Sequence, residues 1–191
     1  MSAITAQSTV EEVAAIVSDA LERAGIMATL SGGSAVTIYS NNEYLSRDLD
    51  FVTSAMIADL KPVLESLGFE HTGIPTLSQF THPKVQWYLE FPPSPLSFGH
   101  LYVDPEDCAV IERPVGKLRI ITPTQSVMDR LAATYAWKDP QSLDQAILVA
   151  ANQDIDWEVL RGWFANEGES DDEWQRFKDA VGARKSQRPE R

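Results

Sequence analysis

The sequence predicts an α/β (α+β) fold in which a core of strands and helices is followed by a region made only of helices. Up to residue 121, segments with strand-like alternation take turns with segments whose apolar residues recur at helical spacing. Beyond that point only the helical spacing remains. We therefore divide the chain into a core at 1–121, a C-terminal helical region at 122–182, and a polar tail at 183–191 that we expect to be disordered.

The core is predicted to begin with an amphipathic helix over 8–25. Ser8 and Glu11 have the spacing of a capping box, and Gly25 stands where a C-terminal stop belongs. The strands predicted next are 27–31, 48–53, 69–72, 78–81 and 85–91, and the helices are 34–42 and 56–67. Pro62 is tolerated in the second of these helices only in its first turns. We expect the two short strands around a turn at 73–75 to be antiparallel.

The second half of the chain changes character. A proline-containing connection over 92–117 has poor periodicity, with one strand near 109–112. A last strand is predicted at 117–121. The helices that follow are predicted at 124–137, from Pro140 through Ala150, at 157–165 and at 173–181.

Composition and charge limit the function. The formal net charge is −12 and the sequence pI is about 4.6, which argues against binding nucleic acid through a broad basic face. The single cysteine, Cys108, permits no internal disulfide and fits a reducing compartment. The N-terminus has no signal-peptide pattern, and no apolar run has the length of a membrane span. We therefore expect a cytoplasmic protein with no membrane partner.

Two aspartates one residue apart, Asp48 and Asp50, stand in a predicted strand. Side chains at i and i+2 of a strand point to the same face, so the two carboxylates lie side by side while Leu49 and Phe51 face the core. Neighbouring carboxylates repel each other, and a divalent cation offsets that cost. Hard oxygen ligands favour Mg²⁺ or Mn²⁺.

A glycine turn precedes this pair. Gly32 and Gly33 let the backbone turn tightly and come close to a ligand. If a helix begins at Ser34, its free N–H groups form an anion site, and the Ser34 hydroxyl adds a donor to a phosphate oxygen. A phosphate-binding turn and a metal-binding acid pair in one short unit indicate nucleotide chemistry.

The two motifs together carry a family resemblance. The run from Gly32 to Ala35, followed by Ser46-Arg47-Asp48-Leu49-Asp50-Phe51, resembles the signature of the DNA polymerase β-like nucleotidyltransferases, and most closely that of the AbiEii-like toxins of type IV toxin–antitoxin systems. Fourteen residues lie between Gly33 and Asp48, as is expected of that group. The resemblance implies a mixed sheet flanked by helices.

A second segment extends the resemblance. The segment from Ile121 to Ala146 is similar to the AbiEii-like pattern of a proline, a Lys-Leu helix and a Lys/Arg-Asp dipeptide. Arg130 takes the expected Lys place, and Lys138 with Asp139 forms the dipeptide. The resemblance covers roughly residues 28 to 150. It also implies a third carboxylate on a neighbouring strand, for which Glu90 is the candidate; the family more often has Asp there.

The implied reaction moves a nucleoside monophosphate from a nucleoside triphosphate to an acceptor hydroxyl. Asp48, Asp50 and Glu90 would bind the metal and perform the catalysis. The nucleotide would be bound by Gly32, Gly33, Ser34, Arg47, Arg130 and Lys138. The acceptor implied by the AbiEii resemblance is tRNA or a protein, with an antitoxin as partner. The alternatives are transfer to a small molecule of the aminoglycoside type, or an inactive nucleotide-binding or protein-interaction module.

Each feature also has a structural interpretation without function. The aspartates could cap a helix, the glycines could form an ordinary turn, and Glu90 could face water from an edge strand. The three cations could be solvated or paired with surface acids.

Overall fold

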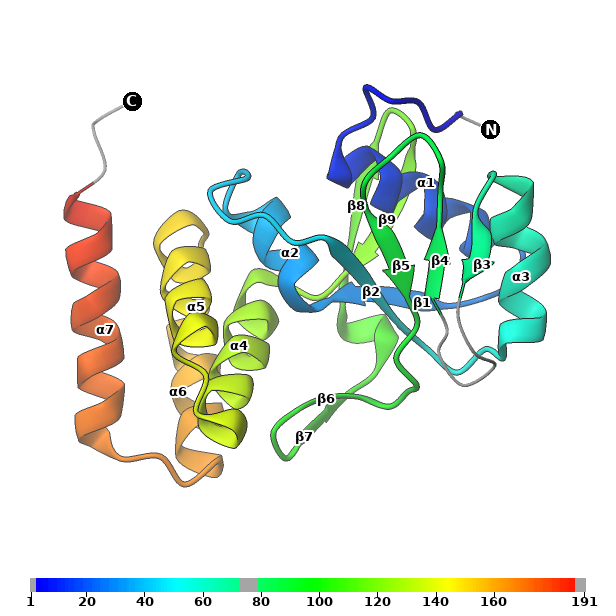
Figure 1. Cartoon of the computed structure of the whole chain (residues 1–191). Coiled ribbons are helices and arrows are strands. Elements are labelled where there is room, and N and C mark those ends of the chain that lie inside the picture. The colour runs from blue at the N-terminus through cyan, green and yellow to red at the C-terminus, as the bar shows by residue number, and fades with distance from the viewer. Residues whose placement is uncertain (1–2, 73–78, 188–191) are drawn as a thin grey trace.

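The computed structural model describes residues 3–72 and 79–187 of the chain. These residues form a seven-stranded sheet, a two-stranded hairpin and seven α-helices (Figure 1). The strands are β1 (Ala28–Ser31), β2 (Asp48–Thr53), β3 (Glu70–Thr72), β4 (Gln79–Thr81), β5 (Tyr88–Glu90), β6 (Leu96–Phe98), β7 (Leu101–Val103), β8 (Ala109–Arg113) and β9 (Gly116–Ile120). The helices are α1 (Val10–Arg23), α2 (Gly32–Tyr39), α3 (Ile57–Ser66), α4 (Pro123–Trp137), α5 (Pro140–Asn152), α6 (Trp157–Asn166) and α7 (Asp171–Ser186).

The sheet has the strand order β3-β4-β5-β2-β1-β9-β8. β2 pairs parallel to β5 and β1 pairs parallel to β9, whereas the other neighbours are antiparallel. The predicted mixed sheet flanked by helices is therefore confirmed. β5 lies between β4 and β2, so Glu90 is on an interior strand and not on an edge. The turn predicted at 73–75 lies outside the described residues.

Helix α1 forms as its apolar spacing predicts, but its capping box lies one residue later. Thr9 and Glu12 form the box, since the backbone N–H of Glu12 donates to Thr9 Oγ1 at 3.2 Å and that of Thr9 donates to Glu12 Oε2 at 2.8 Å. The Ser8 hydroxyl accepts instead from the backbone of Thr5 at 3.1 Å. α1 packs against β1 and β9.

Strand β2 runs through the middle of the sheet with the predicted bounds and alternation. Leu49 and Phe51 are fully buried, and with Leu89 of β5 and Phe80 of β4 they belong to one apolar cluster. The partly exposed residues of β2 alternate with these and face the other side of the sheet. β2 therefore places the acids opposite the core.

Strand β5 is shorter than the predicted 85–91. Val85 still belongs to a turn, because its N–H donates to the carbonyl of His82 at 3.3 Å. Pro92 and Pro93 follow the strand and have no N–H to continue the ladder. The chain nevertheless stays beside β2, since the N–H of Thr53 donates to the Pro92 carbonyl at 3.2 Å.

The hairpin of β6 and β7 lies in the stretch predicted as an irregular connection. It attaches the helical region to the core, because Trp163 Nε1 of α6 donates to the Phe98 carbonyl at 3.0 Å. At the hairpin turn the backbone N–H of His100 donates to Glu167 Oε1 at 2.8 Å.

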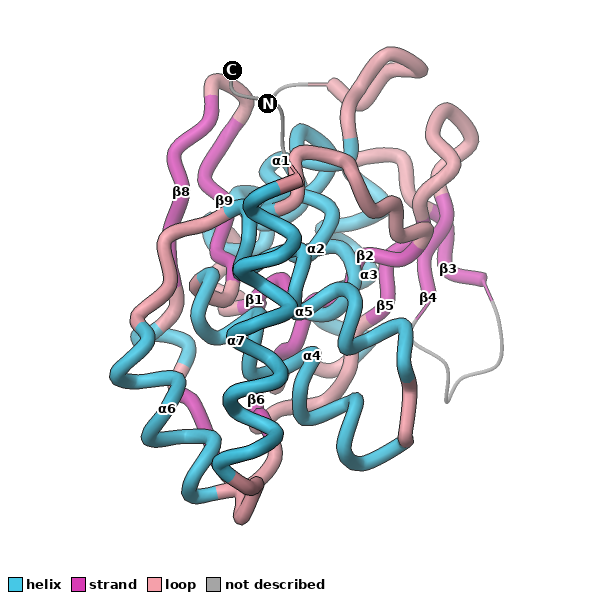
Figure 2. Tube along the Cα trace, turned by 90° about the vertical axis from the view of Figure 1, so that its left-hand side faces the viewer, coloured by secondary structure: helices cyan, strands magenta, loops and turns pink. Residues whose placement is uncertain are grey.

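The helical region packs beside the sheet, with α5 in contact with α2, α4 and α7 (Figure 2). Helix α4 begins at Pro123, one residue before its predicted start, and Thr122 is its N-cap. α7 continues to Ser186, beyond the predicted end at 181, so the tail predicted from residue 183 starts inside a helix. Among the described residues, no helix combines the length and apolarity needed to cross a membrane.

Candidate functional site

Three carboxylates meet on the sheet face opposite the apolar core. Asp50 of β2 is directly paired with Glu90 of β5 across a parallel ladder, and Asp48 is two residues before Asp50 on the same face. One carboxylate oxygen of each residue lies within 4.8 Å of those of the other two. The structure thus brings together the three acids that the sequence singled out, on two strands separated by about forty residues of chain.

The electrostatics of this triad are unfavourable without a cation. Burial, followed by the charges of Asp48 and Glu90, raises the pKa of Asp50 from its ordinary 3.8 to about 7. Arg130 acts in the opposite direction on the same carboxyl group. Three clustered oxygen ligands with an excess of negative charge fit a divalent cation such as Mg²⁺ or Mn²⁺.

The glycine turn and the acids are in direct contact. Gly32 has φ of +64°, and a Cβ atom added there would lie 2.4 Å from Asp50 Oδ2. A Cβ at Gly33 would lie 2.9 Å from the hydroxyl oxygen of Ser46. Both positions therefore need glycine, the first for its backbone conformation and both for the close approach. The glycine turn and the three carboxylates therefore form one site.

Helix α2 starts at Gly32, two residues before the predicted position. Ser31 is its N-cap and makes no side-chain capping hydrogen bond, which leaves the first-turn N–H groups without a capping side chain. Ser34 is fully buried, and its hydroxyl donates to the carbonyl of Ser31 at 2.9 Å. The Ser34 side chain thus stabilises the turn, whereas the sequence predicts that its hydroxyl donates to a phosphate oxygen.

A hydrogen-bond chain links the glycine turn to the first aspartate. The Ser46 hydroxyl donates to Asp48 Oδ1, and the Ser46 N–H donates to Thr37 Oγ1 at 2.9 Å. The Thr37 hydroxyl donates in turn to the Gly33 carbonyl at 3.2 Å. Ser46 belongs to the motif that carries the family resemblance, yet its function as a support for Asp48 is visible only in the fold.

Two further polar residues adjoin the acids. Gln79 of β4 faces Glu90 across the antiparallel ladder, and its Nε2 donates to Glu90 Oε1 at 3.1 Å. Tyr88 is in register with Asp48, and its phenol pKa is raised by burial and by the charges of all three acids. Sequence reasoning missed both. The alternation of β5 could have identified Tyr88, because it lies two residues before Glu90 on the same face.

The three predicted cations are placed differently. Arg130 of α4 is mostly buried, its Nη2 lies 2.7 Å from Asp129 Oδ2, and it is close enough to lower the pKa of Asp50. Arg47 is exposed, and its carbonyl accepts from the N–H of Tyr88 at 3.1 Å. Lys138 is the exposed C-cap of α4, with φ of +52°. The structure therefore places Arg130 near Asp50 and the backbone of Arg47 beside Tyr88, whereas among the described residues it gives no contact between Lys138 and the acid site.

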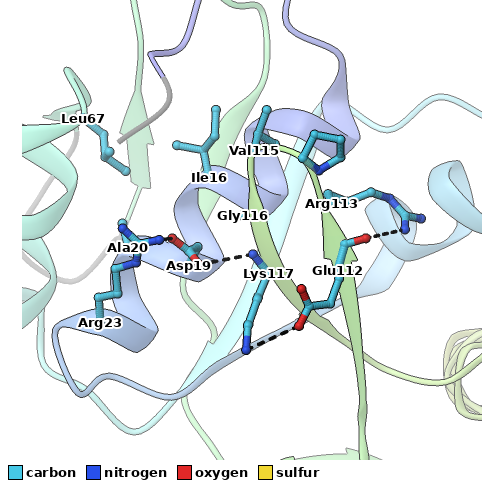
Figure 3. Close-up of a pocket in the computed structure, with 11 residues that line it drawn as sticks. Ile16, Asp19, Ala20, Arg23, Leu67, Glu112, Arg113, Val115, Gly116 and Lys117 are labelled. Atoms are coloured by element: carbon cyan, nitrogen blue, oxygen red, sulfur yellow. Dashed lines mark hydrogen bonds and ion pairs between the residues drawn. The ribbon is translucent and has the colours of Figure 1, made fainter.

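A separate hollow of about 450 Å³ lies between α1 and the turn of β8 and β9 (Figure 3). Four of its charged side chains are paired with each other: Arg23 Nη2 lies 2.8 Å from Asp19 Oδ2, and Lys117 Nζ lies 3.4 Å from Glu112 Oε1. The fifth, Arg113, is paired with Glu11 outside the lining, at 2.6 Å. None of the three triad acids lines it. This hollow is distinct from the acid site.

Comparisons with known proteins agree with this architecture. No protein-family model matches the chain, and no curated protein matches it in sequence. Among solved structures, an antigenic nucleotidyltransferase-like protein from Paracoccidioides brasiliensis is similar with a TM-score of 0.63 and 14% identity, over 94% of each chain. ANT(2")-Ia in complex with adenylyl-2"-tobramycin is similar with a TM-score of 0.51 and 16% identity, over 82% of this chain and 97% of that one. The chain therefore has the mixed α/β fold of nucleotidyltransferases.

Proposed function

We propose that this protein is a metal-dependent nucleotidyltransferase, which moves a nucleoside monophosphate from a nucleoside triphosphate to an acceptor hydroxyl. The observation that carries the proposal is the contact between the glycine turn and the acid triad. The backbone at Gly32, which carries no side chain, lies directly against the Asp50 carboxylate. The carboxylate oxygens that the three acids offer as ligands lie within 4.8 Å of one another. Such a site suits a triphosphate with its divalent cation, because phosphate binds to free backbone N–H groups and the cation binds to carboxylates.

The residues have separate roles in this proposal. Asp48 and Asp50 hold Mg²⁺ or Mn²⁺, and Ser46 orients Asp48. The metal, when bound, neutralises charge on the phosphates and on the pyrophosphate leaving group. Glu90, held by Gln79, contributes a further ligand or accepts the proton of the acceptor hydroxyl. Gly32 and Gly33 bring the backbone against the triphosphate, and Arg130 and Arg47 supply positive charge beside it.

The proposal leaves two classes of acceptor to be tested. The AbiEii-like resemblance favours a toxin that modifies tRNA or a protein and is neutralised by an antitoxin. The acidic chain and the similarity in fold to ANT(2")-Ia, whose structure contains adenylyl-2"-tobramycin, favour a small molecule. A module of the same fold without catalysis is the third alternative, and it predicts no transfer to any acceptor.

A labelling experiment tests the proposal. The protein is incubated with each of the four nucleoside triphosphates, labelled at the α-phosphate, and with Mg²⁺, in the presence of total tRNA, cell protein or the small-molecule fraction. Nucleotidyl transfer puts the α-label into one acceptor fraction, whereas a γ-label appears only in pyrophosphate. Asp48→Asn is the control that removes a proposed metal ligand. Absence of transfer from all four nucleotides, together with absence of Mg²⁺-dependent nucleotide binding, would refute the assignment.

A further inference from the structure

Two adjoining hollows continue the sheet face that carries the acid triad. The first, of about 570 Å³, is lined by Glu90, by the chain that follows it to Ser94, and by residues 53–57 after β2. The lining of the second, of about 290 Å³, includes Thr29 and Val52 from the sheet and Asp104 and Glu106 from the segment after β7. Both hollows include Thr53, Ser54 and Ser94 in their lining. We call the two together the Ser94 groove.

The groove opens directly beside the proposed site of chemistry. Val52 is two residues after Asp50 on the same face of β2, a separation of about 7 Å along a strand. Thr29 is paired with Val52 just as Ser31 is paired with Asp50, so both belong to this face. At the other end Glu90 is at once a member of the triad and a wall of the groove. A ligand in the groove can thus reach the triad without leaving the sheet face.

The charged side chains that line the Ser94 groove are all acidic. Among the residues that the structure describes, its charged lining residues are Glu90, Asp104 and Glu106, and no lysine or arginine lines either hollow. Arg119 lies nearby, where it donates to the Pro105 carbonyl at 3.0 Å, but it is not part of the lining, and its Nη2 lies 3.7 Å from Glu22. The chain as a whole carries a formal charge of −12. The groove therefore attracts cations and repels polyanions.

We propose that the Ser94 groove binds the acceptor, and that this acceptor is a small organic cation which carries both amino and hydroxyl groups. The inference rests on the proposed nucleotidyl transfer and adds the place and the chemical class of the acceptor. The volume of the first hollow, about 570 Å³, is in the range of small-molecule sites. An RNA acceptor would bring its phosphates against Asp104 and Glu106 with no cation to compensate.

The transfer step forms one bond to the α-phosphorus and breaks another. The acceptor hydroxyl oxygen forms a bond to the α-phosphorus of the triphosphate, and its proton passes to the Glu90 carboxylate. The bond from the α-phosphorus to the oxygen that bridges to the β-phosphate breaks, and pyrophosphate leaves with that electron pair. The amino groups remain protonated and take no part in bond making. Their function is to hold the acceptor against the groove acids.

A matched pair of ligands tests the cation requirement. The probes are the β-1,4-linked trisaccharide of glucosamine, which is cationic, and its fully N-acetylated form, which is neutral. We expect calorimetry at low ionic strength to give at least about tenfold tighter binding of the cationic form, weakened by added salt. A 20-residue single-stranded RNA should not bind. Equal affinity for the two saccharides, absence of binding of either, or tighter binding of the RNA would overturn the proposal.

Matched variants locate the binding site. In Asp104→Asn combined with Glu106→Gln, affinity for the cationic saccharide should fall about three- to tenfold. The control, Glu158→Gln combined with Asp172→Asn, removes the same charge from exposed positions on α6 and α7 and should leave that affinity unchanged. Equal losses in both double variants would show a net-charge effect only and would overturn the assignment to the groove.

Nucleotide binding separates this inference from the proposed function. Wild-type protein that binds Mg²⁺ and nucleoside triphosphate but fails the saccharide and variant tests disproves the groove assignment alone. If the wild-type protein binds no nucleotide in the presence of Mg²⁺, the proposed function is disproved, whatever the result of the saccharide measurements.

Discussion

A Cβ atom added to Gly32 would lie 2.4 Å from Oδ2 of Asp50, so the glycine turn and the second aspartate are packed without room for one carbon atom. Gly32 also has a backbone conformation, φ of +64°, that residues with a side chain rarely adopt. This contact turns two separate sequence motifs into one site, and it can be tested by substitution.

Gly32→Ala should displace the Asp50 carboxylate and reduce nucleotidyl transfer by about 10²-fold or more, because a shift of about 1 Å in a positioned group can cost that much. Gly168→Ala is the matched control, since Gly168 has φ of +83° but nothing within 4 Å of the added Cβ. Both variants should lose about 1 kcal/mol or more of stability from backbone strain. If the two variants keep the same activity, the close contact has no functional importance.

Asp48→Asn and Asp50→Asn should each lower the turnover number by on the order of 10²-fold or more, as expected when a group that stabilises charge in the transition state is lost. The amides keep the shape of the side chains but not their charge. Single-turnover kinetics with α-labelled nucleotide measures the effect. Wild-type turnover in both variants would contradict the assignment of the acids.

The raised pKa of Asp50 predicts a dependence of stability on pH. The folded-state value of about 7 lies above the ordinary 3.8, so the folded protein holds this proton more tightly than the unfolded chain does. The contribution of this proton to the stability of the folded state is complete below about pH 4 and is lost as the pH rises through about 7. Metal-free Asp50→Asn should therefore be more stable than wild type at pH 8 and less dependent on pH over this range, with melting temperature as the measurement.

The same titration predicts the behaviour of the metal. Protons and Mn²⁺ compete for the Asp50 carboxylate, so Mn²⁺ affinity should rise as the pH increases through about 7. At pH 8, saturating Mn²⁺ should raise the melting temperature of the wild type, and removal by a chelator should reverse the change. Asp50→Asn should show a much smaller response. An equal response in the variant would place the ion elsewhere.

Ser46→Ala should weaken Mn²⁺ binding about tenfold, because outer partners that orient metal ligands typically contribute that much. The substitution removes the hydroxyl that donates to Asp48 Oδ1 and leaves the backbone bond from Ser46 to Thr37 in place. Ser66→Ala is the control, since this exposed serine also donates a hydrogen bond, to the Val63 carbonyl at 2.6 Å, but lies at the end of α3. Titration of Mn²⁺ by paramagnetic resonance distinguishes the two variants.

The parts of the fold with a local period were predictable. The alternation of β2 predicts its bounds and the direction of its acids, and the apolar spacing predicts the helices to within a few residues. The hairpin of β6 and β7 was missed because each strand has only three residues, too few to establish a period, and because Leu101 and Tyr102 are both exposed, so β7 shows no alternation. Its position depends on Trp163, more than sixty residues later in the chain.

The sequence by itself determined the central features of this protein: the face on which Asp48 and Asp50 lie and the glycines of the turn. These depend on properties of neighbouring residues, namely the period of a strand and the conformations open to glycine. Only the tertiary structure decided that Glu90 pairs with Asp50, that Ser46 and Gln79 hold two of the acids, and that an acidic groove adjoins them. Those relationships require strand register and close packing between distant segments, and a local pattern of residues carries no information on either.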